Sequence, residues 1–429
     1  MKFLLAAILL CCSITAYCQQ YWLPVSSPVI RSINRSVFID TVYGWAVGDS
    51  GIIIHTSNSG INWVKQASGI INYPIDDVFF LNQRLGWAVA NDFFFFGTVL
   101  LKTTDGGANW QSSRYPDTTL VFNTVHFLDS LTGYLSGYSG VIYKTTDGGS
   151  NWFNCFIDTA YCQYLYLFPK NKFYFLNENT GYICGGQIDI QGMIWRTTNA
   201  GANWYTYCVS AEPLYDIKAF GNNKVQSVGG DYEYGFSNVV SYSSGNDWNY
   251  EFTGIIGRGF AIAYRTPSEV WVPLNFTAAF AVNTDSASLG SQWKEIPIDG
   301  TTKINSAVFV TPTFGWAFGG EGKIYKYNNA VISISGENEI IPEAFTIEQN
   351  YPNPFNPGTL INYTLNRSGY VKAVIYDITG REVYRLIEAY KQSGFHSVQW
   401  NSQNMPTGIY FLTMEMQGIS KSIKMLLIK

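Results

Sequence analysis

A turn-like octamer recurs along the chain and limits what the chain can fold into. It reads TTDGGANW at residues 103–110 and TTDGGSNW at residues 145–152. Weaker copies occur elsewhere, and the tryptophans that close all the copies are Trp63, Trp110, Trp152, Trp204, Trp248 and Trp293. They follow one another at roughly 45-residue intervals, a period typical of a β-propeller with one blade per repeat.

A second motif, rich in glycine and aromatic residues, predicts seven blades because it occurs seven times. Its copies are GWAVG (44–48), GWAVA (86–90), GYLSG (133–137), GYICG (181–185), VQSVG (225–229), EVWVP (269–273) and GWAFG (315–319). The seventh repeat lacks a fourth strand after GKIYKYNNA (322–330). Residues 21–27, YWLPVSS, resemble the fourth strands of other repeats. We therefore expect residues 21–27 to complete the last blade, which removes two open sheet edges.

The octamer is predicted to be the turn between the third and fourth strands of each repeat. Asp105 and Asp147 are expected to accept hydrogen bonds from the turn backbone, as aspartates commonly do in turns. The paired glycines that follow permit positive φ angles. Trp110 and Trp152 would start the outer strand, and we expect Trp110 to be buried across the turn. This interpretation makes the octamer a structural part rather than a binding loop.

Composition supports an all-β chain and argues against nucleic acid as a partner. Aromatic residues make up 17% of the 429 residues, charged residues make up 14%, and the net charge is −4. The high share of aromatic residues is typical of an all-β protein rather than of a helical enzyme. The net negative charge does not indicate the basic patch that nucleic-acid binding requires. Residues 1–18, with Lys2 before an apolar run, are predicted to be a secretory signal peptide. No transmembrane segment is expected in the mature chain.

Four cysteines remain after the predicted cleavage, namely Cys155, Cys162, Cys184 and Cys208. An exported protein can keep disulfides. Cys155 and Cys162 flank a predicted strand connection and could pair with each other, and four buried thiols are an equal alternative. Because the spacing fits no zinc site, neither a metal nor a cofactor is expected.

The C-terminal part of the chain is predicted to be a separate small β-sandwich. Residues 19–330 form the predicted propeller, residues 331–345 the linker, and residues 346–429 the second domain. Three prolines at positions 352, 354 and 357 exclude a helix at its start. Short alternating segments then follow, separated by turn residues, as in a sandwich.

The octamers resemble Asp-boxes, also called BNR repeats. Together with GWAVG they resemble the photosystem II stability/assembly factor-like propeller repeat, over residues 21 to about 330. This resemblance implies the fold and leaves the function open, since such propellers include assembly factors, sialidases, xyloglucan hydrolases and secreted proteins. The triple-arginine arrangement of sialidases has no counterpart in the early motifs of this chain.

The C-terminal domain resembles the sorting domain of the type IX secretion system, in its FlgD-like immunoglobulin form. The matching segments are NYPNPFNP (350–357), YDITGREV (376–383), MPTGIYFL (405–412) and KSIKMLLIK (421–429). The resemblance implies Sec export followed by passage across the outer membrane. The type IX machinery would be a partner through residues 346–429, and the protein would be secreted or held at the outer cell surface.

One face of the propeller is the predicted ligand face. The loops opposite the Asp-boxes and the starts of the innermost strands would meet there. The candidate residues on it are Asp76, Asp77, Asn123, Asp216, Arg258, Phe93, Tyr232 and Tyr234. Solvated loop residues are the alternative for the polar members. For Phe94 to Phe96, which follow Phe93, the alternative is an extension of the third strand.

We expect a non-enzymatic propeller that binds a macromolecular partner, a surface protein or a glycan. Three histidines in different units exclude an obvious Ser-His-Asp arrangement. One alternative is a carbohydrate-binding or glycoside-hydrolase propeller, favoured if Asp76 or Asp77 faces Asp216 across an open cleft. An envelope complex assembly factor is the other.

Overall fold

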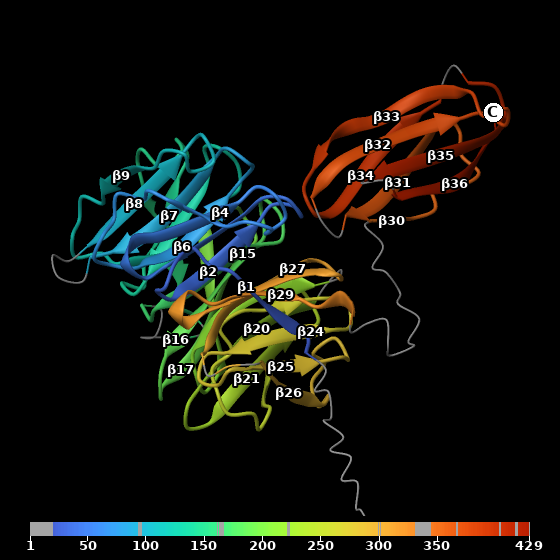
Figure 1. Ribbon diagram of the computed structural model, residues 1–429. Coiled ribbons are helices and arrows are strands. Elements are labelled where there is room, and N and C mark those ends of the chain that lie inside the picture. Colours follow the sequence, from blue (N-terminus) through green and yellow to red (C-terminus); the bar gives the residue numbers. More distant parts are fainter. Residues whose placement is uncertain are drawn as a thin grey trace, which may run out of the picture.

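The chain is almost entirely β-structure in the computed structural model (Figure 1). The structure describes residues 20–92, 97–160, 162, 167–220, 224–298, 300, 302–330, 345–365, 368–402, 405–416 and 419–428. Its only helical elements over those ranges are two single turns, η1 (Asp49–Gly51) and η2 (Gly320–Gly322). The prediction of an all-β propeller is confirmed, whereas the predicted signal peptide lies outside the described residues.

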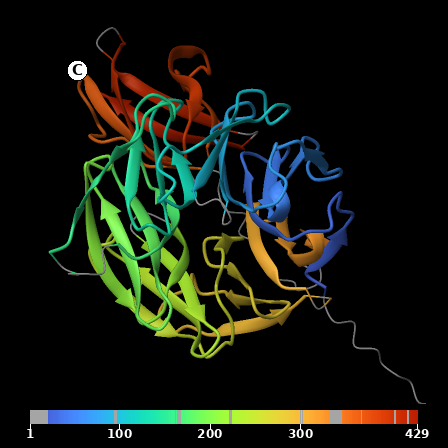
Figure 2. The same cartoon turned by 90° about the vertical axis from the view of Figure 1, so that its left-hand side faces the viewer.

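Seven sheets are arranged around a ring in the described part of residues 20–330 (Figure 2). Each of the first three blades is a four-stranded antiparallel meander. Their strands are β2 (Ile33–Phe38), β3 (Gly44–Gly48), β4 (Ile52–Thr56) and β5 (Val64–Gln66); β6 (Ile75–Phe80), β7 (Gly86–Asn91), β8 (Thr98–Thr103) and β9 (Gln111–Arg114); β10 (Phe122–Phe127), β11 (Gly133–Gly137), β12 (Ile142–Thr145) and β13 (Phe153–Asn154).

The fourth blade has an additional outer strand, β14, which runs parallel to β18, while the fifth and sixth blades are again four-stranded. Their strands are β14 (Phe156–Asp158), β15 (Lys170–Phe175), β16 (Gly181–Gln187), β17 (Gln191–Thr197) and β18 (Asn203–Ser210); β19 (Leu214–Phe220), β20 (Lys224–Asp231), β21 (Gly235–Ser241) and β22 (Asn249–Phe252); β23 (Ala263–Tyr264), β24 (Val270–Leu274), β25 (Ala279–Asn283) and β26 (Trp293–Pro297).

The last blade is built from both ends of the propeller sequence. Strands β27 (Ile304–Thr311), β28 (Phe314–Gly319) and β29 (Ile324–Tyr327) are followed by β1 (Trp22–Val25), which pairs antiparallel with β29. In Figure 2 the orange strands therefore lie next to the blue ones. Trp22 is 1% exposed and stacks on Phe280 of the sixth blade at 5.0 Å between ring centroids. The closing strand thus also fills the core between two blades.

Aromatic side chains interlock neighbouring blades. Trp45 on β3 stacks face to face on Phe80 of the next blade, with centroids 3.6 Å apart. Phe80 in turn lies against Gly86 of its own blade, where a Cβ atom would come within 2.5 Å of the ring. The same arrangement recurs where Trp87 stacks on Phe127 at 3.6 Å. The two residues of the GW motif therefore contact two different phenylalanines. The glycine makes room for the phenylalanine of its own blade, and the tryptophan stacks on the phenylalanine of the next blade.

The octamers form compact turns at the third-to-fourth strand connection. In the second blade the Thr103 hydroxyl donates to Asp105, and the backbone N–H groups of Gly107 and Asn109 donate to Thr103 and Asp105 at 2.8 and 2.9 Å. The Asn109 side chain also bonds Asp105. This bond, followed by those from the Asn109 backbone and the Thr103 hydroxyl, lowers the pKa of Asp105 to about 2. Asp147 has the same set of partners in the third blade.

The octamers also bond the preceding blade through a main-chain carbonyl. Gly106 O accepts hydrogen bonds from Trp45 Nε1 at 3.0 Å and from Gln66 Nε2 at 2.9 Å. The corresponding carbonyl of Ala200 accepts from the Tyr134 hydroxyl at 2.7 Å. Since donors and acceptors lie on different blades, each such octamer holds two blades together.

The closing tryptophans of the octamers are not equally buried. Trp204 is fully buried and Trp63 is 6% exposed. Trp110, which we expected to be buried, is only half-buried, as are Trp152, Trp248 and Trp293. Trp110 packs edge-on against Phe80 and donates to Gln66, so its outer side stays accessible to solvent.

The C-terminal domain consists of two sheets packed face to face, separate from the ring (Figure 1). Phe355, Tyr363 and Trp400 belong to the core between the sheets. The strands are β30 (Phe345–Ile347), β31 (Gly358–Leu365) and β34 (Gly394–Asn401) in one sheet, and β33 (Glu382–Lys391), β32 (Gly369–Tyr376), β35 (Gly408–Met416) and β36 (Ile419–Leu427) in the other.

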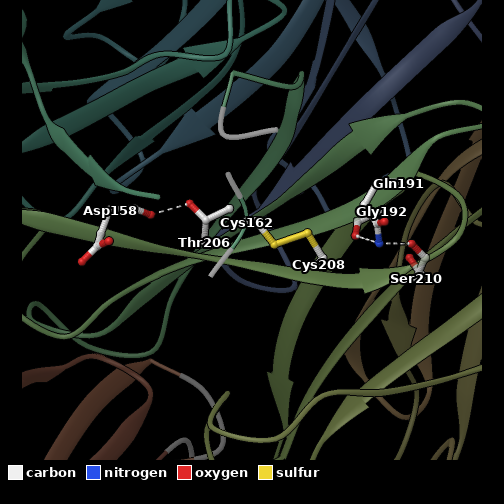
Figure 3. Close-up of a disulfide and its surroundings, with 7 residues drawn as sticks. All are labelled: Asp158, Cys162, Gln191, Gly192, Thr206, Cys208 and Ser210. Atoms are coloured by element: carbon white, nitrogen blue, oxygen red, sulfur yellow. Dashed lines mark hydrogen bonds between the residues drawn. A yellow bond between two sulfur atoms is a disulfide. The ribbon is translucent and has the colours of Figure 1, made fainter. Parts of the chain in front are cut away.

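The disulfide pairing differs from the one that the spacing suggested. Cys162 is bonded to Cys208, 46 residues further along the chain, while Cys155 and Cys184 are free thiols (Figure 3). The predicted Cys155–Cys162 pair is therefore wrong. The physical reason is β14, because it folds the connection after the third blade back along β18, which carries Cys208.

We expect Trp204→Ala to destabilise the propeller far more than Trp110→Ala does. Trp204 is surrounded by Tyr134, Phe173 and Phe175, with ring centroids about 6 Å away. Its removal should lower the free energy of unfolding by about 3–5 kcal/mol. The half-buried Trp110 should cost roughly 1–2 kcal/mol. Denaturant unfolding measures both values, and equal losses would contradict the difference in packing.

Candidate ligand-binding face

A cavity of about 550 Å³ opens at the centre of the ring, on the face opposite the octamer turns. It is lined from all seven blades, by the starts of the innermost strands and by the loops that follow the second strands. The lining residues that we use below are Asn34, Arg35, Asp49, Asp76, Asn123, Tyr138, Asn171, Tyr215, Arg258, Phe260, Lys303 and Asn305.

β-Bulges aim one residue of the innermost strand into this cavity in six of the seven blades. The register of the first two strands shifts at the same place in six blades, between the first and third residues of the innermost strand. A bulge leaves one residue without a partner and turns its side chain aside. The residues at this position are Asn34, Asp76, Asn123, Asn171, Tyr215 and Asn305, and every one of them lines the cavity.

The residue after the bulge binds between blades instead. Asp77 is 1% exposed, forms an ion pair with Lys172 and accepts a hydrogen bond from Thr124. Asp216 accepts from the backbone N–H of Ile262 at 2.7 Å. Asp77 and Asp216, predicted for the ligand face, are not among the residues that line the cavity. Asp216 therefore does not face Asp76 or Asp77 across this cavity, as the glycosidase alternative requires.

Asp76 is the most perturbed acid of the cavity. Burial raises its pKa to about 7, although a hydrogen bond from Asn91 and the charge of Arg35 act in the opposite direction. Asn91 Nδ2 lies 2.5 Å from Asp76 Oδ2. Asp76 is therefore about half protonated near neutral pH, and can either donate or accept a proton there.

Aromatic and basic groups make up another wall of the cavity. Arg35 donates to the carbonyl of Phe260 at 2.9 Å, and the Phe260 ring stacks on Tyr215 at 4.6 Å. The guanidinium of Arg258 lies 3.9 Å from the centroid of Tyr232, and its Nε is buried without a hydrogen-bond partner among the described residues. With Lys303, this wall is positive.

Exposed aromatic side chains continue this wall on to the rim. Tyr232 is 45% exposed and packs against Phe276, itself 59% exposed. Tyr234 is also exposed and lies next to Phe252. We call Tyr232, Tyr234, Phe252 and Phe276 the aromatic rim. Phe93, the remaining predicted contact, lies outside the described residues.

Three carboxyl groups lie close together beside the aromatic rim. The side chains of Asp189, Glu212 and Asp231 have oxygens within 4.8 Å of one another, a separation compatible with a metal ion. Glu212 Oε2 accepts from the backbone of Asp189, and Asp231 accepts from the backbone of Tyr234. The second of these bonds orders the loop that carries Tyr232 and Tyr234.

The sequence also predicts Arg35 and Asn305 near the channel mouth, and both line the cavity. It misses Tyr215, Tyr138, Phe260 and the bulge residues Asn34 and Asn171. An alignment of the innermost strands on the residue after the bulge would have found the bulge set. In IDD (75–77) and LYD (214–216) only the middle residue faces the cavity, and in INR (33–35) both Asn34 and Arg35 do. Tyr138 and Phe260 lie in loops of unequal length, where the repeat has no fixed register.

Two family models match the chain. Residues 349–429 match the secretion system C-terminal sorting domain, and residues 66–232 match the photosynthesis system II assembly factor YCF48. The chain combines a YCF48-like propeller domain with a type IX sorting domain. Its sorting domain indicates type IX export to the outer cell surface or the extracellular space. The FlgD-like immunoglobulin form of that domain stays a prediction.

Solved structures with the same fold extend the likeness over the YCF48-like propeller. A structure described as YCF48 bound to D1 peptide is 19% identical, covers 72% of this chain and 96% of its own, and has a TM-score of 0.57. YCF48 from Cyanidioschyzon merolae is 17% identical, covers 72% of this chain and 99% of its own, also at 0.57. These identities establish the fold alone.

A GH74 enzyme from Niastella koreensis shares the fold at 11% identity, covering 94% of this chain and 67% of its own, with a TM-score of 0.58. A sequence search of the curated proteins found no match. In the described part of the chain, none of the helical turns approaches the length and apolarity that crossing a bilayer requires.

We expect Asp76→Asn to stabilise the protein at neutral pH and to have little effect in acid. A carboxyl whose folded pKa is about 7 binds a proton that the unfolded chain releases near pH 4. Stability is therefore lost as the pH rises from about 4 to 7, and the amide removes that loss. Melting temperatures of both proteins between pH 3.5 and 8 measure the effect. A difference that stays constant with pH would contradict the raised pKa.

Proposed function

We propose that this secreted propeller binds a macromolecular partner, most directly a peptide segment of another protein, through the central cavity and the aromatic rim. The observation that carries the proposal is the stacking of Arg258 on Tyr232 at 3.9 Å, which joins the positive wall to exposed aromatic side chains. Exposed aromatic residues and arginines contribute most to binding energy at protein interfaces.

Two further features support a peptide as the ligand. The Oδ1 of Asn123, a bulge residue that lines the cavity, is buried with no hydrogen-bond partner among the described residues and can accept from a peptide N–H. A propeller of the same fold is described as YCF48 bound to D1 peptide. If the partner is an unassembled outer-membrane protein, the protein would act as an envelope assembly factor.

The test uses the full chain and a library of random 12-residue peptides displayed on phage. We expect Arg258→Ala and Tyr232→Ala to weaken the selected peptides at least about tenfold, equal to about 1.4 kcal/mol. Fluorescence anisotropy with labelled peptides measures the affinity.

Leu131→Ala is the matched control, because Leu131 is 56% exposed on the opposite face, where its carbonyl bonds the Gly148 backbone. It should leave the affinity unchanged. Peptides whose binding depends on Leu131 but not on Arg258 would move the site to the other face.

A glycan-directed function is the second candidate, favoured by Asp76. A carboxyl with a pKa of about 7 in a cavity is suited to general acid catalysis of glycosidic bond cleavage. Asp49, whose side chain accepts from Asn34 at 2.8 Å, is the other acid of the lining. A hydrolysis screen on polysaccharides, read as new reducing ends, tests this. Activity should fall at least about 100-fold in Asp76→Asn, and activity equal to wild type would exclude Asp76.

A further inference from the structure

A second, smaller cavity lies between the second and third blades, outside the central site. Its volume is about 250 Å³, and no residue of the binding face lines it. Trp87, Lys102 and Ser113 line it from the second blade, and Gly148, Gly149 and Trp152 line it from the octamer of the third. We call it the interblade crevice.

The equivalent place between the first and second blades is filled by Gln66. Its Nε2 donates to Gly106 O at 2.9 Å, and its Oε1 accepts from Trp110 Nε1 at 3.2 Å. The amide lies so close to Gly107 that a Cβ there would come within 2.1 Å of it. A carboxamide thus has the right size and hydrogen-bonding groups for this position.

Ser113 occupies the position of Gln66 in the second blade. Gln66 pairs with Ile53, three residues before the octamer, and Ser113 pairs with Leu100, also three residues before it. Serine is too short to reach the octamer of the next blade, so the crevice remains. Trp152 Nε1, with no glutamine beside it, donates to Gly149 O within its own turn.

The crevice leaves one buried donor without an acceptor. Trp87 corresponds to Trp45, whose Nε1 donates to Gly106 O at 3.0 Å. At the third blade the equivalent carbonyl, Gly148 O, accepts instead from Lys102 Nζ at 2.9 Å. Trp87 is 4% exposed, and its Nε1 is buried with no hydrogen-bond partner in the described structure. An unpaired buried N–H is costly, so an acceptor supplied from outside would be favoured here.

The edge of the second blade beside the crevice is open. All four residues of β9 are exposed, and no strand pairs with its outer edge in the described residues. In the fourth blade, the corresponding edge strand β18 is covered by β14, which the chain itself supplies. Exposed sheet edges accept extended peptides, whose alternate side chains then enter adjacent pockets.

We propose that the interblade crevice is a binding site for the carboxamide side chain of a partner's glutamine, presented by an extended segment along β9. The amide oxygen would accept from Trp87 Nε1. The amide nitrogen would donate to the carbonyl of Gly148 or Gly149, as Gln66 does to Gly106. Leu100, Leu101, Val125 and Leu135 would contact the methylene groups.

The first test observes the Trp87 indole N–H in the full chain by NMR, with Trp87→Phe used to assign the signal. The probe is N-acetyl-glutamine N-methylamide, and its control is the norleucine analogue of nearly equal length. We expect a saturable downfield shift of the Trp87 indole proton with the glutamine probe only. An unchanged signal at every probe concentration would mean that the crevice does not take a carboxamide, and an equal shift with norleucine would mean that it does not select one; either result would overturn the proposal.

The second test fills the crevice from within. Ser113→Gln should place a carboxamide in the crevice within reach of the Trp87 indole. It should move the Trp87 indole signal without any probe, raise the melting temperature and weaken probe binding at least tenfold. Ser113→Leu is the matched control, which should block the probe without the downfield shift. Because Ser113 is exposed, neither change should prevent folding. A Ser113→Gln protein that binds the probe as tightly as wild type would refute the site.

Discussion

The stacking of one blade's aromatic residue on the next blade's phenylalanine is the contact on which the ring depends. Trp45 on Phe80 and Trp87 on Phe127, both at 3.6 Å, bring adjacent sheets together at a fixed distance. Each phenylalanine can lie there only because a glycine of its own blade has no side chain. The octamer turns add polar bonds between the same pairs of blades, and Trp45 takes part in both kinds of contact.

The repeat made the propeller and its turns predictable, because glycine, aspartate and tryptophan at fixed spacing have few structural uses. Details that break the repeat were harder to predict. Cys162 pairs with Cys208 because an irregular connection folds back as β14, and sequence spacing carries no trace of that. Asp76 and Asp77 are adjacent and chemically identical, yet a bulge points one into the cavity and leaves the other buried against Lys172.

Neighbouring positions of one innermost strand serve different purposes, the lining of the cavity and the contacts between blades. Asp77 and Asp216, which follow the bulge, bind neighbouring blades, whereas Asp76 and Tyr215 at the bulge position line the cavity. Asn, Asp and Tyr all occupy the bulge position without altering the register. Substitution of a bulge residue such as Tyr215 can therefore change the lining of the cavity without changing the strand register, whereas Asn171 and Asn305 also bond the next blade.

The pairing of β1 with β29 has a consequence for the order of events in export. The two strands are separated by about 300 residues, so their contact forms only after the whole propeller has left the Sec channel. Until then Trp22 has no pocket and the edge of β29 is open. The sorting domain follows β29 in the chain and emerges later still. In a molecule that presents a folded sorting domain to the secretion machinery, every strand needed to close the ring has therefore already been translocated. The position of the sorting domain after β29 thus ensures that only complete propellers carry it.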